Sequence, residues 1–90
     1  MAPPFDPAKD AANIARHGVS LWLAFDMDFG VALIREDTRA AYGEQRFQAI
    51  GPIGAALYVL VFTYRDEEIR PISLRRAEKA EARMFRKELE

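Results

Sequence analysis

Hydrophobic and polar positions along the chain predict helices at both ends and strands between them. Phe5-Asp6-Pro7 opens the first predicted helix, with Asp6 as its N-cap and Pro7 at the first helical position. The helix is expected to end at His17-Gly18, because Gly18 can adopt the left-handed conformation that closes helices. Its apolar positions are Ala8, Ala11, Ala12, Ile14 and Ala15.

A second, shorter helix is predicted to begin at Val19-Ser20, with Ser20 as its N-cap, and to end around Asp26, Asp28 and Gly30. Trp22 and the phenylalanines are interpreted as core residues, and the core candidates of this helix are Leu21, Trp22, Ala24, Phe25 and Met27. Asp26 and Asp28 form a pair of carboxylates, but no His, Cys or third carboxylate lies at a ligating spacing. The sequence therefore predicts no metal site.

The middle of the chain predicts a four-stranded antiparallel sheet. The expected strands cover Gly30 to Arg35, Glu44 to Ile50, Ala55 to Tyr64 and Ile69 to Leu74. The third is apolar on both faces, which is typical of a central strand. Gly51-Pro52 and Gly54 are expected to break the chain before it. Pro71 cannot donate a backbone hydrogen bond, which predicts a free edge or a bulge in the last strand.

The last predicted strand passes with almost no loop into a basic helix, and Arg75 and Arg76 lie at the junction. The stretch Arg70 to Glu90 holds seven basic and four acidic residues, whereas Met1 to Ile69 holds six basic and ten acidic residues. A positive C-terminal element thus follows an acidic body, and fixed guanidinium groups there suit phosphate oxygens. The alternative is a solvated helix whose glutamates pair with basic neighbours three or four residues away. Its apolar stripe, which could lie on the sheet or on a partner, comprises Ala77, Ala80 and Met84.

Together these elements predict an α+β fold with two N-terminal helices, a four-stranded antiparallel β-meander and a C-terminal helix. The length of 90 residues suits a single domain spanning 1–90. The absence of cysteine excludes disulfides and thiolate chemistry and fits a cytoplasmic location. The longest apolar run, Ala55 to Phe62, is too short to cross a bilayer, and no signal-peptide pattern is visible, so no membrane contact is expected.

Three segments carry motifs in a fixed order. The first runs from Phe5-Asp6-Pro7-Ala8-Lys9 through Asn13 to His17-Gly18-Val19-Ser20, and the second is Tyr42-Gly43-Glu44 with Arg46 and Ile50-Gly51. The third is Val61-Phe62-Thr63 followed by Arg70-x-Ile72-Ser73-x-Arg75-x-Ala77 and Glu81. In this order and spacing, the chain from Phe5 to about Phe85 resembles the BrnT family of bacterial toxins, the toxin half of type II toxin–antitoxin pairs.

The resemblance implies a fold similar to the RelE-type ribonuclease toxins and an endoribonuclease that cleaves mRNA without a metal or another cofactor, which inhibits translation. It also implies a cognate antitoxin with a DNA-binding domain, and a toxin–antitoxin complex that represses its own promoter. This chain would then contact DNA only as part of that complex. Pro71, Glu78 and Phe85 depart from the family's pattern. These departures motivate the alternative of a weakly active or inactive module whose main role is to bind its antitoxin.

Metal-free RNA cleavage needs a base for the 2′-hydroxyl, positive charge near the phosphorane and an acid for the 5′ leaving oxygen. His17 is the one side chain of a type that changes charge near neutral pH, so it is a candidate base or acid. The alternative is that His17 only closes its helix. Lys9 lies two helical turns earlier on roughly the same face, although a lysine at such a position is more often solvated.

Arginines are the remaining candidates. Arg46 and Arg75 are assigned to the scissile phosphate and Arg70 to the backbone of the bound strand, with Arg76 and Lys79 as further RNA-binding candidates. Ser73 shares a strand face with Arg75, and its hydroxyl either orients a phosphate or satisfies a backbone group. The tyrosines could stack a base, or they could be core residues of the strands; they are Tyr42, Tyr58 and Tyr64.

Overall fold

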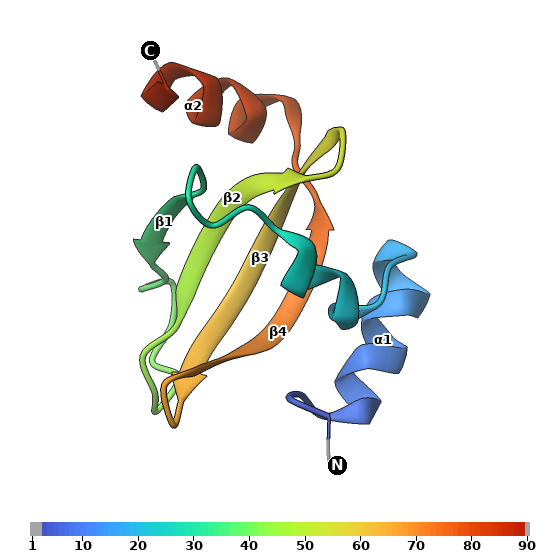
Figure 1. Ribbon diagram of the computed structural model, residues 1–90. Coiled ribbons are helices and arrows are strands. Elements are labelled where there is room, and N and C mark those ends of the chain that lie inside the picture. The colour runs from blue at the N-terminus through green and yellow to red at the C-terminus, as the bar shows by residue number, and fades with distance from the viewer. Residues whose placement is uncertain (1–2, 90) are drawn as a thin grey trace.

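The computed structural model describes residues 3–89, and its elements form an α+β fold (Figure 1). Two helical segments, α1 (Pro7–His17) and the 3₁₀ helix η1 (Leu21–Asp26), precede the sheet, and α2 (Lys79–Leu89) follows it. The strands are β1 (Leu33–Glu36), β2 (Phe47–Ile53), β3 (Ala56–Arg65) and β4 (Glu68–Arg76). They pair antiparallel in the order β1-β2-β3-β4, which confirms the predicted meander with β3 inside it. Among the described residues, no helix is long and apolar enough to cross a membrane.

The ends of α1 follow the local chemistry of the sequence. The Asp6 side chain accepts a hydrogen bond of 2.9 Å from the backbone N–H of Ala8, and Pro7 occupies the first helical position. Gly18 has a φ of 76° and donates its N–H to the Ile14 carbonyl at 2.8 Å. Both predicted caps are confirmed, and they fix where the helix begins and ends.

The boundaries of β1 and β2 lie later than predicted. Gly51-Pro52 does not break the chain but lies inside β2, where Pro52 is paired with Leu57. The pairing of β1 with β2 has already ended at Leu33 and Ile50, so Pro52 needs no N–H toward β1. Gly51 is required because a Cβ there would come within 2.9 Å of the Ala32 Cβ.

The β4 strand is both an edge strand and a bulged one, which confirms the prediction from Pro71. Val61 pairs with Ser73 and Phe62 pairs with Pro71, so Ile72 is an extra residue at the register shift. β4 also runs further than predicted and includes Arg75 and Arg76. Both arginines therefore belong to the end of the strand, and two residues separate them from α2, which begins at Lys79.

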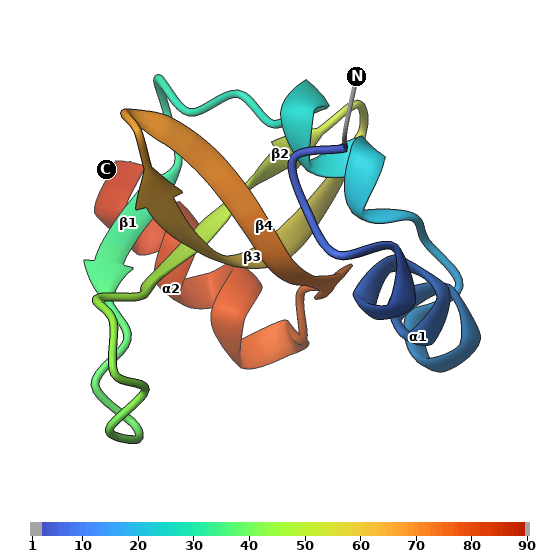
Figure 2. The same ribbon diagram turned by 90° about the horizontal axis from the view of Figure 1, so that it is seen from below.

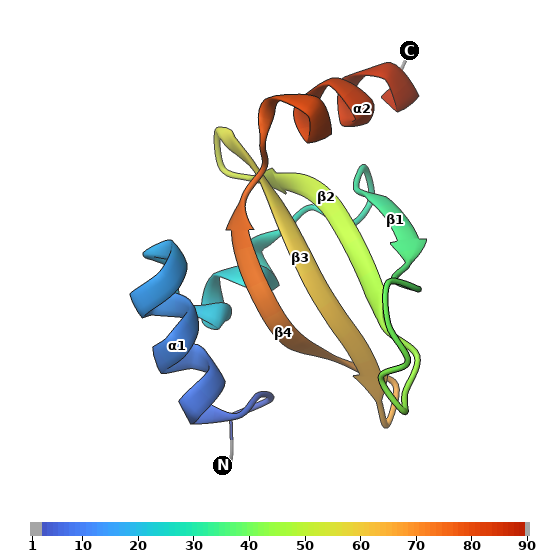
Figure 3. The ribbon, with the colours of Figure 1, turned by 180° about the vertical axis from the view of Figure 1, so that it is seen from behind.

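The two faces of the sheet differ in what covers them. The face under η1, here called the aromatic face, carries the larger core cluster, and the opposite polar face carries a smaller cluster in which Phe85 of α2 packs with Ile50 and Val59. Figure 2 shows η1 and α2 on opposite sides of the sheet. Seen from behind (Figure 3), α2 lies near one end of the polar face. The larger cluster comprises Phe5, Leu21, Ala24, Met27, Ala49, Ile53, Leu60, Phe62 and Leu74.

Two predicted core positions are wrong. Trp22 and Phe25 are 55% and 44% exposed, because a 3₁₀ helix has three residues per turn and directs only Leu21 and Ala24 inward. The alanines and Ile14 of α1 are also exposed, since α1 lies beside the edge of the sheet and buries only Asn13. In α2, the buried residue is Phe85, while Ala80 and Met84 are exposed.

Candidate functional site

A side-chain amide fastens α1 to the edge of the sheet. Asn13 Nδ2 donates to the carbonyl oxygens of Leu74 and Val19, each at 2.9 Å, and Asn13 Oδ1 accepts from the Leu74 N–H at 3.0 Å. Asn13 is only 5% exposed, and its polar atoms are satisfied by these bonds. The amide pairs with an edge strand as another strand would, so α1 is fixed relative to β4.

This attachment brings a stripe of α1 over the bulged part of β4. Lys9, Asn13 and His17 are spaced by four residues, which places them on one face of the helix. A cavity of about 280 Å³ separates this stripe from Ile72 and Ser73 of β4. Lys9, His17 and Ser73, three of the residues singled out from the sequence, thus line one cavity.

A second cavity, of about 130 Å³, adjoins the first and shares Lys9 and Ile72 with it. It brings Lys9 together with Arg46, which precedes β2, and Arg70 of β4. We call the two adjoining cavities the β4 cleft. The remaining residues around the second cavity are Phe5, Asp6, Glu44, Thr63, Arg65 and Pro71.

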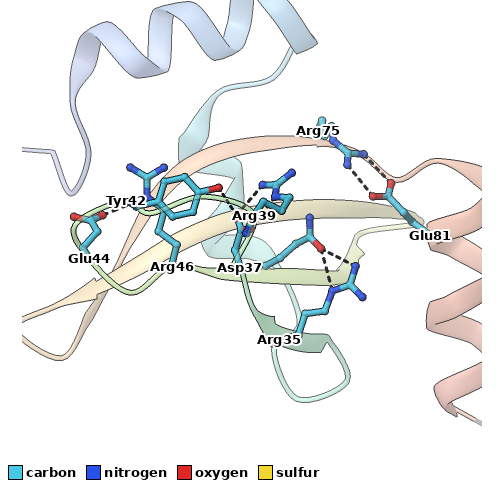
Figure 4. Close-up of polar contacts among 9 residues, drawn as sticks. Arg35, Asp37, Arg39, Tyr42, Glu44, Arg46, Arg75 and Glu81 are labelled. Carbon is cyan, nitrogen blue, oxygen red and sulfur yellow. Dashed lines mark hydrogen bonds and ion pairs between the residues drawn. The ribbon is translucent and has the colours of Figure 1, made fainter.

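Arg46 is held by an aromatic ring and a carboxylate. Its guanidinium carbon lies 4.1 Å from the centre of the Tyr42 ring, and its Nε lies 3.5 Å from Glu44 Oε2 (Figure 4). The buried Nε makes no hydrogen bond within the described residues. Glu44 also lies 3.7 Å from Arg65, so one carboxylate is shared between two arginines. Arg46 is therefore oriented by its neighbours while its charge is only partly compensated.

Arg75, by contrast, is committed to a partner. Its two terminal nitrogens donate to the two Glu81 oxygens, each at 2.7 Å, and Glu81 Oε1 also accepts from the Glu78 N–H at 2.8 Å (Figure 4). The hydrogen bonds from Arg75 lower the pKa of Glu81, and the same bonds raise the pKa of Arg75. The predicted pairing of α2 glutamates with residues three or four away does not describe this contact, which spans six residues.

The structure does not bring Arg75 into the β4 cleft with Arg46, nor Arg76 or Lys79. The Arg76 guanidinium lies 5.5 Å from the centre of the Tyr58 ring, on the aromatic face. Lys79 is the exposed first residue of α2. Five of the eight predicted site residues line the cleft: Lys9, His17, Arg46, Arg70 and Ser73.

Sequence reasoning missed a polar network on the loop after β1. Both Asp37 oxygens accept hydrogen bonds of 2.7 Å from Arg39, and the Tyr42 hydroxyl donates to Oδ2 at 3.4 Å. The bonds from Arg39 lower the pKa of Asp37 to about 2. The Asp37 N–H donates to the Arg46 carbonyl at 2.8 Å, which ties the loop to the arginine of the cleft. The only sequence signal was an Asp-x-Arg spacing in a polar turn.

On the same polar face, Arg35 of β1 donates from Nε and Nη2 to Gln48 Oε1 of β2, at 3.2 and 3.0 Å. Leu33 and Ile50 are cross-strand partners, so Arg35 and Gln48 are partners two residues further along.

Within residues 3–89, no group of three or more His, Cys, Asp or Glu side chains is arranged to hold a metal ion.

Comparison with known protein families gives a match over most of the chain. A scan against models of protein families matches residues 5–81 to the family described as "Ribonuclease toxin, BrnT, of type II toxin-antitoxin system". A search of curated proteins finds no match. The matched range includes every residue that lines the β4 cleft and ends at Glu81, the partner of Arg75.

Proposed function

Because this chain belongs to the BrnT family of ribonuclease toxins from type II toxin–antitoxin systems, we propose that it cleaves mRNA in the β4 cleft and is neutralised by its cognate antitoxin. The observation that carries the proposal is that Lys9 joins two cavities, one with His17 and Ser73 and the other with Arg46 and Arg70. A cleft with a titratable imidazole at one end and fixed cations at the other suits a phosphodiester.

In the proposed reaction, His17 takes the proton of the 2′-hydroxyl, and the 2′-oxygen attacks the adjacent phosphorus. The bond from phosphorus to the 5′-oxygen breaks, and the leaving oxygen takes a proton from water, which gives a 2′,3′-cyclic phosphate and a 5′-hydroxyl. Lys9 and Arg46 stabilise the charge on the phosphorane, and Arg70 holds the backbone of the bound strand. General acid–base help contributes about 10²–10⁴-fold, and each preorganised donor about 3–4 kcal/mol.

Arg75 has a different place in this scheme. Its two hydrogen bonds to Glu81 occupy part of the guanidinium and neutralise its charge, and we therefore rank it behind Arg46. Ser73, which faces the same side of β4, remains the candidate that orients a phosphate oxygen at the His17 end of the cleft.

We further propose that cleavage proceeds without a metal ion, in the cytoplasm of a bacterium, and slows translation there. The four-stranded meander with helices before and after it supports a likeness to the RelE-type fold within a single domain. On this proposal the antitoxin carries the DNA-binding domain, and the complex represses its own promoter.

The test is cleavage of a defined mRNA in EDTA by purified protein free of antitoxin, with the ends mapped. We expect cyclic-phosphate ends from the wild type and a loss of about 10²–10⁴-fold in His17→Asn. Lys9→Met and Arg46→Met should lose a similar factor. Arg86→Ala is the matched control, because it removes an exposed cation of α2 outside the cleft. Full activity in His17→Asn, or equal loss in Arg86→Ala, would refute the assignment.

A binding module is the second candidate function. The observation that favours it is the Arg75–Glu81 pair, which neutralises a guanidinium that could otherwise bind RNA. Wild-type protein that binds its antitoxin but neither cuts RNA nor slows growth would favour this reading.

A further inference from the structure

Part of the aromatic face remains uncovered by η1. Of the eight exposed large hydrophobic side chains among the described residues, four lie on η1 or on this face. Trp22 and Tyr64 are more than half exposed, at 55% and 53%. Phe25 of η1 and Ile34 of β1 are 44% and 42% exposed. Exposed apolar side chains gathered on one face of a small protein are typical of a protein interaction site.

Two of these side chains, Trp22 and Tyr64, pack against other aromatic rings. The Tyr64 ring lies 5.6 Å from Phe47 and 5.5 Å from Phe62, centre to centre, both in edge-on contacts. The Trp22 ring lies 4.9 Å from the buried Phe5 ring and 6.0 Å from Phe25. A ring fixed in this way loses little conformational freedom when a partner covers it, which favours binding.

A recess of about 270 Å³ lies beside Tyr64 and Phe47. Its other lining residues are Glu44, Gln45, Thr63 and Arg65. A recess floored by two aromatic rings can accept one apolar side chain of a partner, and such anchors contribute most of the binding energy in many interfaces.

Exposed carboxylates accompany this apolar surface. Asp26 follows Phe25, Glu36 is the cross-strand partner of Phe47, and Asp66-Glu67 forms the turn just after Tyr64-Arg65. None of these carboxylates forms an ion pair within residues 3–89, whereas Asp37, Glu44 and Glu81 all do. Their charge repels RNA phosphates and attracts lysine and arginine side chains.

We propose that the aromatic face is the docking surface for a basic, amphipathic segment of the cognate antitoxin. The inference rests on the proposed function only for the identity of the partner. Apolar side chains of the segment cover Trp22, Phe25, Ile34 and Tyr64, and its cations meet Asp26, Glu36 and the Asp66-Glu67 turn. The recess beside Tyr64 shares Glu44, Thr63 and Arg65 with the second cavity of the β4 cleft, whereas Trp22, Phe25, Ile34 and Tyr64 themselves line neither cavity of the cleft. An antitoxin bound to the aromatic face would therefore lie next to the cleft while contacting different apolar side chains.

The test measures the Kd of purified full-length antitoxin for toxin variants at two salt concentrations. The double variant Ile34→Lys/Tyr64→Lys should raise Kd at least about tenfold, because it places cations opposite cations and removes apolar contact. Glu36→Lys should raise Kd severalfold and weaken the salt dependence. Leu89→Lys is the matched control, because Leu89 is equally exposed, at 58%, but lies on α2, and its Kd should stay within about twofold.

RNA cleavage by the free Glu36→Lys and Leu89→Lys variants is measured in parallel and should equal that of the wild type, because neither residue lines the β4 cleft. A Kd unchanged within twofold in a folded double variant overturns the docking site, as does equal weakening by Leu89→Lys or failure of the wild type to bind. If the double variant does not fold, the Kd of Glu36→Lys tests the docking site instead. This variant should fold because Glu36 is exposed at the end of β1. A wild type that binds but does not cut RNA refutes the proposed cleavage and leaves the docking site supported.

Discussion

The side-chain amide of Asn13 pairs with both backbone polar groups of Leu74, as a neighbouring strand would. Asn13→Ala removes these bonds and the one to Val19, and it leaves the buried polar groups of Leu74 unpaired. We expect the free energy of unfolding to fall by about 2–4 kcal/mol, measured by urea denaturation.

Ile14→Ala is the matched control, because Ile14 is the next residue and is 47% exposed. It should change stability by no more than about 0.5 kcal/mol. Since Asn13 also holds Lys9 and His17 beside β4, Asn13→Ala should lower cleavage even at temperatures where the protein stays folded. Unchanged stability in Asn13→Ala would show that α1 is attached by other contacts.

Gly51 of β2 packs closely against Met27 and Ala32, which lie at and after the end of η1. In Gly51→Ala, the new Cβ meets Ala32 Cβ at 2.9 Å and Met27 Sδ at 3.0 Å. We expect a loss of about 1–3 kcal/mol by overpacking, measured by thermal or urea unfolding. Adding Ala32→Gly should recover part of the loss, and a double-mutant cycle without coupling between the two sites would contradict this explanation.

The ring of Tyr42 lies under the guanidinium of Arg46 at 4.1 Å. Tyr42→Leu removes the face on which Arg46 rests, and kcat for RNA cleavage should fall about tenfold because the cation is no longer oriented. Tyr42→Phe keeps the ring and loses only a 3.4 Å hydrogen bond to Asp37, so it should remain close to the wild type. Equal losses in the two variants would assign the effect to the hydroxyl instead of the ring.

Asp37 makes stability depend on pH in the acid range. Its pKa is lowered to about 2 in the folded protein by the bonds from Arg39, against about 3.9 for an ordinary aspartate. The folded state therefore favours the carboxylate, and this contribution is complete above about pH 4 and is lost as pH falls toward 2. Asp37→Asn and Arg39→Ala should both flatten this part of the profile in urea unfolding at pH 5, 3 and 2. A profile in either variant that parallels the wild type would contradict the assignment.

Features set by local chemistry could be predicted from the sequence. The caps at Asp6 and Gly18 depend on residues within one turn, and the bulge at Pro71 depends on a missing N–H. The common face of Lys9 and His17 follows from helical periodicity alone. Periodicity by itself does not distinguish the residues that line the cleft from solvated side chains. The resemblance to the family pointed to these residues.

Features set by tertiary contacts could not be predicted. The exposure of Trp22 follows from a 3₁₀ turn, and its sequence pattern does not differ from that of a short α-helix. Asn13 is polar and was not expected to be the only buried residue of α1. The partner of Arg75 is chosen by the path of the chain between β4 and α2, which brings Glu81 back onto the strand end.

The attachment of α1 has a consequence for solubility. An edge strand offers unpaired backbone groups to any other extended chain, and proteins protect such edges because they promote aggregation. At Leu74 this protection is supplied by one amide on a helix that has almost no apolar anchorage. Release of α1 would therefore open the proposed cleft and expose the unpaired backbone groups of β4. Protein that has lost its active site in this way would also be prone to aggregate.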